Sequence, residues 1–136
     1  MKIDILPQNV PHSNRLTMVQ GNDVNLHVTV DCECADQEDL SQKDITGYTV
    51  WFTLKRYITD ADINAIIQKI SPATPLIIDA EMGLIRIPIA STDTINLPNW
   101  YQNYYFDVQL KDVAGKIVTS GMGTLGIYPG ITNVKS

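Results

Sequence analysis

The chain has 136 residues, of which 44% are hydrophobic and 18% are charged, and this composition predicts one folded domain rather than a disordered segment. The formal net charge of −5 argues against nucleic acid and anionic membranes as partners, because a negatively charged chain is repelled by phosphate groups. No apolar run reaches the roughly 18 residues that a membrane helix needs, and residues 1–7 lack the apolar core of a signal peptide. We therefore expect a product that is made and folded in a cytoplasm.

Apolar residues in the first half of the chain recur with a period of two, which indicates β-strands. Residues 24–30 form the first such strand, after a predicted tight turn at residues 20–23. The acidic stretch at residues 31–44 has no period and predicts a solvated loop. Residues 48–56 form the next strand, which has two distinct faces. Val50, Phe52 and Leu54 lie on one face, and Thr49, Trp51, Thr53 and Lys55 lie on the other.

Residues 60–70 fit two patterns. Four isoleucines have the spacing of one face of a helix, for which Thr59 or Asp60 would be the N-cap. These isoleucines are Ile63, Ile66, Ile67 and Ile70. The adjacent pair at residues 66–67 also suits a strand. We expect a short helical turn over residues 60–64, followed by a strand that ends at Lys69.

The next part of the chain alternates turns with short strands. A loop with two prolines at residues 71–75 precedes a short strand at residues 76–78. A hairpin turn at residues 80–83 then leads into a strand at residues 84–89. Pro88 cannot donate a ladder hydrogen bond, so we expect it at a sheet edge or at a bulge.

A turn at residues 91–94, whose side chains can bond their own backbone, precedes a strongly alternating strand at residues 101–110. Tyr104, Phe106, Val108 and Leu110 share one face of this strand, and Tyr105, Asp107 and Gln109 share the other. A hairpin turn at residues 112–115 opens a returning strand at residues 116–119. The glycines Gly121, Gly123 and Gly126 weaken the strand pattern that follows, and the last strand is expected at residues 124–128. Together these elements are about seven to eight short strands, a pattern typical of an antiparallel sandwich or barrel.

The two histidines offer little for catalysis. His12 lies in a polar N-terminal stretch, and His27 lies on the polar face of the first strand. A catalytic triad needs a nucleophile beside a base and an orienting acid, and no nucleophile motif occurs in the sequence. We expect both histidines to be surface residues and expect no catalytic residue, so the chain is predicted not to be an enzyme.

The cysteines and acidic residues do not form a metal-binding pattern. His27, Cys32 and Cys34 give H-x4-C-x-C, whereas a structural zinc site needs four ligands with wider cysteine spacing. A disulfide between Cys32 and Cys34 would be strained. The acidic loop at residues 31–44 lacks the motif of a calcium loop. We expect no metal and no cofactor.

Two further patterns are ambiguous. Gly121, Gly123 and Gly126 are spaced like a dinucleotide-binding fingerprint, but no helix is predicted after them, so the match carries no weight. An aromatic cluster could form a sugar-stacking or partner-binding surface, or it could be divided between the core and the sheet surface. The cluster comprises Trp100, Tyr101, Tyr104 and Tyr105.

Several segments occur in an order that resembles a known family. They are residues 20–23 (QGND), 44–52 (DITGYTVWF), 83–89 (GLIRIPI), 91–94 (STDT), 104–110 (YYFDVQL) and 129–132 (PGIT). This series resembles the immunoglobulin-like β-sandwich domain of tailed-bacteriophage structural proteins. That family includes the N-terminal module of baseplate upper proteins and proteins that attach head or tail fibres.

The resemblance implies an all-β, antiparallel immunoglobulin-like sandwich of about 7–8 strands with at most one short helical turn. It places an N-terminal arm at residues 1–15, the sandwich at residues 16–132 and a tail at residues 133–136. The acidic loop is longer than the family pattern, and no further domain follows in the sequence, which favours a decorating, joining or adaptor subunit over a receptor-binding one.

The resemblance also implies a non-enzymatic virion protein, made in the bacterial host, for head decoration, a head fibre, the neck or a tail or baseplate adaptor. Its partners would be other virion proteins and further copies of itself, with a homotrimer suggested by analogy. The alternative is a carbohydrate- or host-surface-binding module of the same fold. Residues 1–14 and the loop at 31–44 are the expected interfaces, and deletion of residues 1–14 is expected to leave the domain folded.

Overall fold

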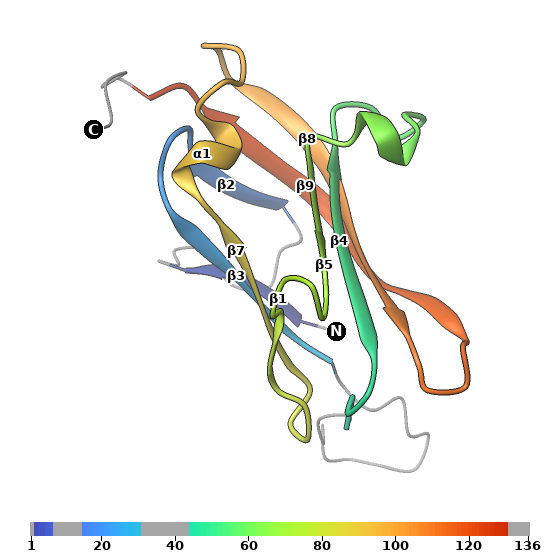
Figure 1. Ribbon diagram of the computed structural model, residues 1–136. Helices are drawn as coiled ribbons and strands as arrows, with labels where there is room; N and C mark the ends of the chain where they lie inside the picture. The colour runs from blue at the N-terminus through green and yellow to red at the C-terminus, as the bar shows by residue number, and fades with distance from the viewer. Residues whose placement is uncertain (1, 7–14, 31–43, 131–136) are drawn as a thin grey trace.

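The computed structural model describes residues 2–6, 15–30 and 44–130, whose strands form a two-layer β-sandwich (Figure 1). One layer is a four-stranded sheet in the order β1-β3-β7-β6. Its strands are β1 (Lys2–Leu6), β3 (Val24–Thr29), β7 (Leu84–Ile89) and β6 (Ile77–Asp79). The other layer is a five-stranded sheet in the order β2-β9-β8-β4-β5. Its strands are β2 (Arg15–Val19), β9 (Ile117–Tyr128), β8 (Gln102–Lys111), β4 (Thr49–Lys55) and β5 (Ile67–Ile70).

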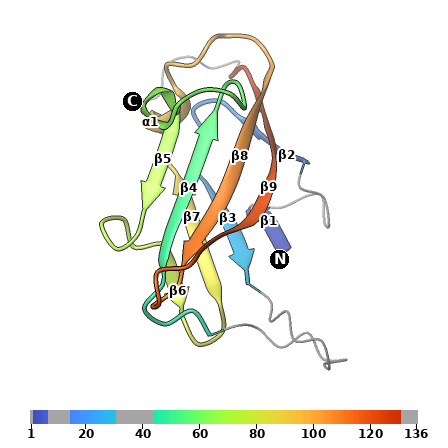
Figure 2. The ribbon, with the colours of Figure 1, turned by 90° about the vertical axis from the view of Figure 1, so that its right-hand side faces the viewer.

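The connectivity is that of an immunoglobulin-like sandwich. Figure 2 shows β5, β4, β8 and β9 side by side in front of β7 and β3. Neighbouring strands of the described sheets run antiparallel, except that β2 runs parallel to β9. The sheet order β1-β3-β7-β6 corresponds to strands A, B, E and D of the immunoglobulin fold, and β4, β8 and β9 correspond to strands C, F and G. The predicted all-β, antiparallel immunoglobulin-like sandwich is confirmed.

The core lies between the two sheets because their strands alternate inward apolar residues with outward polar ones. The predicted inward faces of β4 and β8 are buried. They consist of Val50, Phe52, Leu54, Tyr104, Phe106, Val108 and Leu110. The other sheet contributes Leu26, Val28, Ile85, Ile87 and Ile89. The rings of Phe52 and Phe106 meet in this core at a centroid distance of 5.8 Å.

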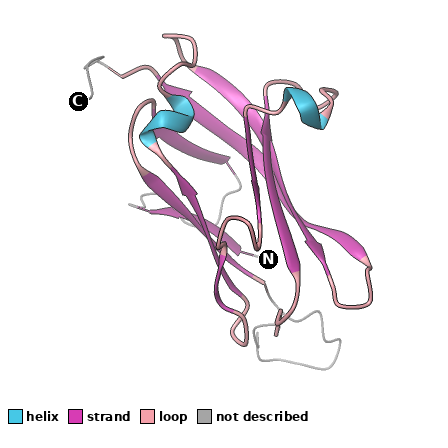
Figure 3. Cartoon of the chain, viewed as in Figure 1, coloured by secondary structure: helices cyan, strands magenta, loops and turns pink. Residues whose placement is uncertain are grey.

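The described residues contain two short helical turns, η1 (Asp62–Asn64) and α1 (Ser91–Thr94), where at most one was expected (cyan in Figure 3). The predicted helical turn near residues 60–64 and the strand after it are both present as η1 and β5. A helix that spans the four isoleucines is excluded, because residues 67–70 form β5 and Ile63 is 92% exposed. The cap of η1 is Ala61, without a side-chain hydrogen bond, so the predicted capping by Thr59 or Asp60 is wrong.

The last strand differs from the prediction. β9 runs unbroken over 12 residues, although its glycines predict two separate strands. Gly123 and Gly126 keep ladder positions opposite Phe106 and Asn103, because a ladder uses backbone groups that glycine retains. The irregularity in this pair is a shift of register between Val108 and Gln109, which is a bulge.

Part of the predicted N-terminal arm belongs to a sheet. Residues 2–6 form β1, an edge strand that pairs antiparallel with β3 from Lys2↔Thr29 to Leu6↔Asn25. The physical reason lies in the sequence, since Ile3 and Ile5 alternate with charged neighbours as in a strand. Deleting residues 1–14 would therefore remove an edge strand instead of leaving the sandwich intact. Arg15, the last residue of the predicted arm, begins β2, whereas residues 1 and 7–14 and the tail at residues 133–136 lie outside the described residues.

Pro88 lies in the part of β7 that extends past the short strand β6, so β7 has no neighbouring strand on that side of Pro88. Arg86 donates its backbone N–H to the Leu76 carbonyl on the β6 side of β7, at 2.8 Å. Because N–H groups two residues apart in a strand point to the same side, the Pro88 nitrogen faces that side too. β6 pairs with β7 only at Leu84 and Ile85, so no ladder partner there requires a donor at Pro88.

A buried polar network ties the β2–β3 turn to the segment around α1. The Gly21 N–H, at a φ of 84°, donates to Thr94 Oγ1 at 2.9 Å, and Thr94 is fully buried. The Gln20 amide donates to the carbonyls of Ile95 and Leu97 at 3.1 and 2.7 Å. Because these bonds satisfy buried backbone groups, they hold one end of the sandwich closed.

Candidate functional site

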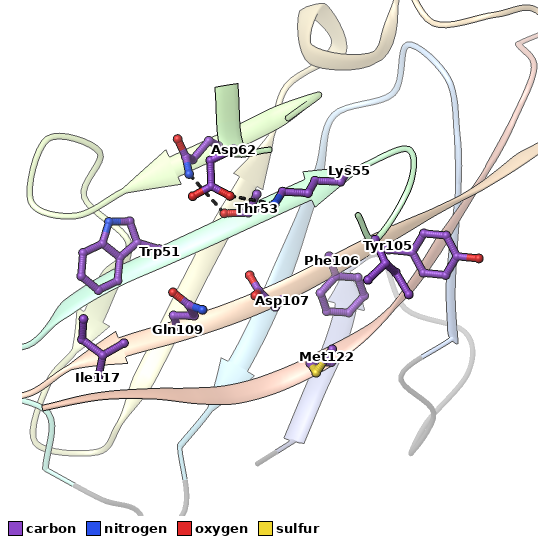
Figure 4. Close-up of a pocket in the computed structure, with 12 residues that line it drawn as sticks. Trp51, Thr53, Lys55, Asp62, Tyr105, Phe106, Asp107, Gln109, Ile117 and Met122 are labelled. Atoms are coloured by element: carbon purple, nitrogen blue, oxygen red, sulfur yellow. Dashed lines mark hydrogen bonds and ion pairs between the residues drawn. The ribbon is translucent and has the colours of Figure 1, made fainter. Parts of the chain in front are cut away.

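The outer face of the five-stranded sheet carries a concavity of about 390 Å³ (Figure 4). The residues that line it come from β4, β5, β8 and β9 and from the β4–β5 connection. They are Trp51, Thr53, Lys55, Ile58, Asp62, Gln68, Tyr105, Phe106, Asp107, Gln109, Ile117 and Met122. The volume is near the lower end of the roughly 300–1,000 Å³ that is usual for small-ligand pockets.

Strand alternation and register bring these side chains together. On β4 and β8 the residues between the buried ones point outward, which is the face that the sequence predicts for them. The antiparallel register pairs Trp51 with Gln109 and Thr53 with Asp107. Directly opposite residues of two antiparallel strands have Cβ atoms about 5 Å apart, so the side chains of each pair lie next to each other on the floor of the concavity.

The ammonium group of Lys55 contacts a carboxylate and a backbone carbonyl at one end of the concavity. Lys55 Nζ forms an ion pair with Asp62 Oδ1 at 2.7 Å (dashed in Figure 4) and donates a hydrogen bond to the Asp60 carbonyl at 2.8 Å. The second contact fixes the ammonium group against the connection that contains η1. The Lys55 side chain is mostly buried, whereas the Asp62 side chain is 72% exposed.

Asp107 lies beyond this pair on the floor of the concavity. Partial burial raises the pKa of the Asp107 carboxyl, the nearby charge of Lys55 lowers it, and the charge of Asp62 raises it. Within the described part of the chain, no group donates a hydrogen bond to this carboxylate. The Asp107 carboxylate is therefore partly removed from water. The positive charge that favours its ionised form is that of Lys55, which is already paired with Asp62.

Neutral polar groups complete the floor. The Gln68 amide on β5 donates to Thr53 Oγ1 at 3.3 Å, which orients the amide across β4. Gln109 is partly buried beside Trp51, and its side-chain amide makes no hydrogen bond with another described residue. Its amide can therefore both donate to and accept from a bound group.

The rim of the concavity is apolar and exposed. Its exposed side chains are Ile58, Tyr105, Ile117 and Met122. Met122 is 60% exposed and Tyr105 is 38% exposed. Exposed apolar side chains beside a few polar groups favour binding of another molecule, because the apolar surface loses water on contact while the polar groups supply specificity.

The predicted aromatic cluster is divided. Tyr104 is buried in the core, and Tyr105 is on the rim of the concavity. Tyr101 packs on the ring of Tyr128 with centroids 4.6 Å apart, and its hydroxyl donates to Asn103 Oδ1 at 2.8 Å. Trp100 is 61% exposed in the α1–β8 connection. These four residues do not form one continuous aromatic surface.

Those of the other sequence candidates that the structure describes form no organised site. His27 is a partly buried residue of β3 opposite Arg86. The glycine fingerprint falls inside β9, so it does not precede a helix. Among the described residues, no three histidine, cysteine, aspartate or glutamate side chains gather in a way that could hold a metal ion. His12, Cys32, Cys34 and nearly all of the acidic loop lie outside the described residues.

One residue of the acidic loop is described. Asp44 Oδ1 accepts hydrogen bonds from the Thr46 hydroxyl at 2.6 Å and from the Thr46 N–H at 2.9 Å. These two bonds, the side-chain bond first, lower the pKa of the Asp44 carboxyl. The loop therefore ends in an Asx turn that leads into β4.

The sequence identified the strand faces but not the site. Strand alternation places Asp107 and Lys55 on outward faces. No sequence pattern indicates that these two residues lie close together or that Asp62 contacts Lys55. A partial signal was present in Asp107, an acidic residue within a strongly apolar strand.

Comparison of the sequence with protein-family models and with curated proteins finds no match. In the described parts of the chain, no helix has both the length and the apolar character to cross a membrane.

Proposed function

We propose that the chain is a non-enzymatic structural protein of a tailed-bacteriophage particle that acts through contacts with other virion proteins. The positions on the particle that fit this role are head decoration, a head fibre, the neck and a tail or baseplate adaptor. Its localisation would be the virion, and it would assemble as a homo-oligomer, for which a trimer is the expected state by analogy.

The observation that carries this proposal is the outer face of the five-stranded sheet. Its rim residues Ile58, Ile117 and Met122 are 65%, 56% and 60% exposed. These three side chains line one concavity, and exposed apolar side chains that gather on one face are a mark of protein contact surfaces. Three of the segments on which the family resemblance rests, residues 44–52, 83–89 and 104–110, overlap the strands β4, β7 and β8.

Quantitative mass spectrometry of particles purified from the culture that produces the chain tests the proposal. A copy number comparable to that of the major capsid protein would assign the chain to head decoration. A copy number that follows the symmetry of the neck or tail would assign it there. Absence from purified particles would refute the structural role.

The second candidate is a carbohydrate- or host-surface-binding module. The specific observation in its favour is that Trp51 and Tyr105 line the same concavity as the amides of Gln68 and Gln109. Aromatic rings and planar polar groups together are suited to sugar rings and hydroxyls. Retention of the isolated protein on host cell envelopes, lost on addition of a free host sugar, would support this candidate over the first.

A further inference from the structure

The charges of the concavity do not balance. Its charged lining residues are Lys55, Asp62 and Asp107, so it has a net charge of −1 when all three are ionised. Lys55 is engaged by the Asp62 carboxylate at 2.7 Å and by the Asp60 carbonyl at 2.8 Å. The carboxylate of Asp107 is left without a cation in direct contact within the described part of the chain.

The surroundings of Asp107 favour a cationic guest. The carboxylate is partly removed from water, so a cation that reaches it is less screened than one at an open surface. Trp51 and Tyr105 offer aromatic rings at the same concavity, and Gln109 offers a free amide oxygen beside the floor. Ile117 and Met122 cover the approach with apolar surface.

An arginine side chain has the chemistry that matches all of these groups. Its planar guanidinium can donate two parallel hydrogen bonds to a carboxylate and can stack on an aromatic ring. Its three methylene groups can lie on an apolar rim while the charged head reaches the floor. A two-fold contact between copies of this face would instead bring two Asp107 carboxylates toward each other, which is unfavourable.

We propose that this concavity binds an arginine side chain presented by a partner protein, with the guanidinium on Asp107 and its face against the aromatic lining. The inference rests on the proposed function in that it assigns the partner's chemistry to an assembly contact. Since the whole chain is acidic, a basic partner segment is also favoured by long-range attraction.

The test uses the full-length chain and two capped tripeptides, Gly-Arg-Gly and Gly-citrulline-Gly. Citrulline keeps the shape of arginine but carries no charge. We expect the arginine peptide to shift the indole N–H signal of Trp51 and the backbone signals of residues 105–109 in NMR titrations. Its affinity should exceed that of the citrulline peptide by about tenfold, as expected for loss of a charge-assisted hydrogen bond.

Two variants with the same change of net charge provide the comparison. Asp107→Asn should reduce binding of the arginine peptide to the level of the citrulline peptide. Glu81→Gln lies in the exposed β6–β7 turn of the other sheet and should leave binding unchanged. An unchanged far-UV circular dichroism spectrum and a cooperative unfolding transition would show that Asp107→Asn is folded.

Several results would overturn the inference. They are no binding of the arginine peptide, equal binding of the two peptides, or full binding by folded Asp107→Asn. Shifts of the same signals by a neutral disaccharide such as maltose, with the arginine peptide silent, would assign the concavity to a sugar. Because these titrations need no particle, their failure is distinguishable from absence of the chain in purified virions.

Discussion

The ring of Tyr101 lies directly over Gly126, so that a Cβ added to Gly126 would stand 2.6 Å from the Tyr101 hydroxyl oxygen. Gly126 has no positive φ, and its backbone conformation is therefore open to any residue. The requirement for glycine near the end of β9 comes mainly from the Tyr101 ring, which also packs against Tyr128, and from Asn103 Oδ1, which would stand 3.0 Å from the added Cβ.

Gly126→Ala is therefore expected to destabilise the domain by about 1–3 kcal/mol, because the Tyr101 ring must move off Tyr128. In a Tyr101→Ala background the same substitution should be neutral or stabilising, by up to roughly 1 kcal/mol, since alanine suits a strand better than glycine. Urea denaturation of the four proteins in this cycle measures the coupling. An equal cost of Gly126→Ala in both backgrounds would contradict the steric explanation.

Thr94→Val tests the network that closes one end of the sandwich. Valine keeps the shape of threonine but removes the oxygen that accepts the Gly21 N–H, leaving a buried donor without its partner. We expect a loss of about 1–3 kcal/mol in the free energy of unfolding. Thr92→Val, at an exposed position of the same short helix α1, is the matched control and should change stability by less than about 0.5 kcal/mol.

The fold could be predicted from the sequence further than the site could. Alternation alone assigned Phe52 and Phe106 to the core and Trp51 and Asp107 to the opposite face, because the side-chain period of a strand is fixed. The glycines of β9 led to a prediction of two strands where there is one. Strand propensity is a weak guide there, because the neighbouring strand β8 supplies the hydrogen-bond partners of the β9 backbone.

The site depends on relations that alternation does not encode. The pairing of Thr53 with Asp107 is set by the register between β4 and β8, which are far apart in the chain. The contact of Lys55 with Asp62 depends on the path of the β4–β5 connection. A one-residue shift of register would have placed a different residue opposite Thr53.

The raised pKa of Asp107 makes its contribution to stability depend on pH. A carboxyl whose pKa is higher in the folded state binds its proton more tightly when folded. Its stabilising effect is complete below the pKa of the unfolded chain and is lost as the pH rises through the folded pKa. Burial is the main cause of the shift, opposed by Lys55 and assisted by Asp62.

Asp107→Asn should consequently become more stable relative to the unsubstituted protein as the pH rises from about 3 to about 7. Urea denaturation of both proteins at several pH values measures this difference. Glu81→Gln, which makes the same change of charge in an exposed turn, is the matched control. A difference for Asp107→Asn that is constant or falls with pH would show that burial does not penalise the charged carboxylate.

Charge substitutions at the other end of the concavity should move the pKa of Asp107 in opposite directions. Lys55→Met removes the cation that lowers this pKa, so the pKa should rise. Asp62→Asn removes an anion that raises it and releases Lys55 from its ion pair, so the pKa should fall. Carbon-detected NMR titration of the Asp107 carboxyl measures both shifts directly. Shifts in the same direction would mean that altered packing, rather than charge, determines the pKa of Asp107. The inference that the Asp107 carboxylate lacks a balancing charge, on which the arginine site depends, would then lose its support.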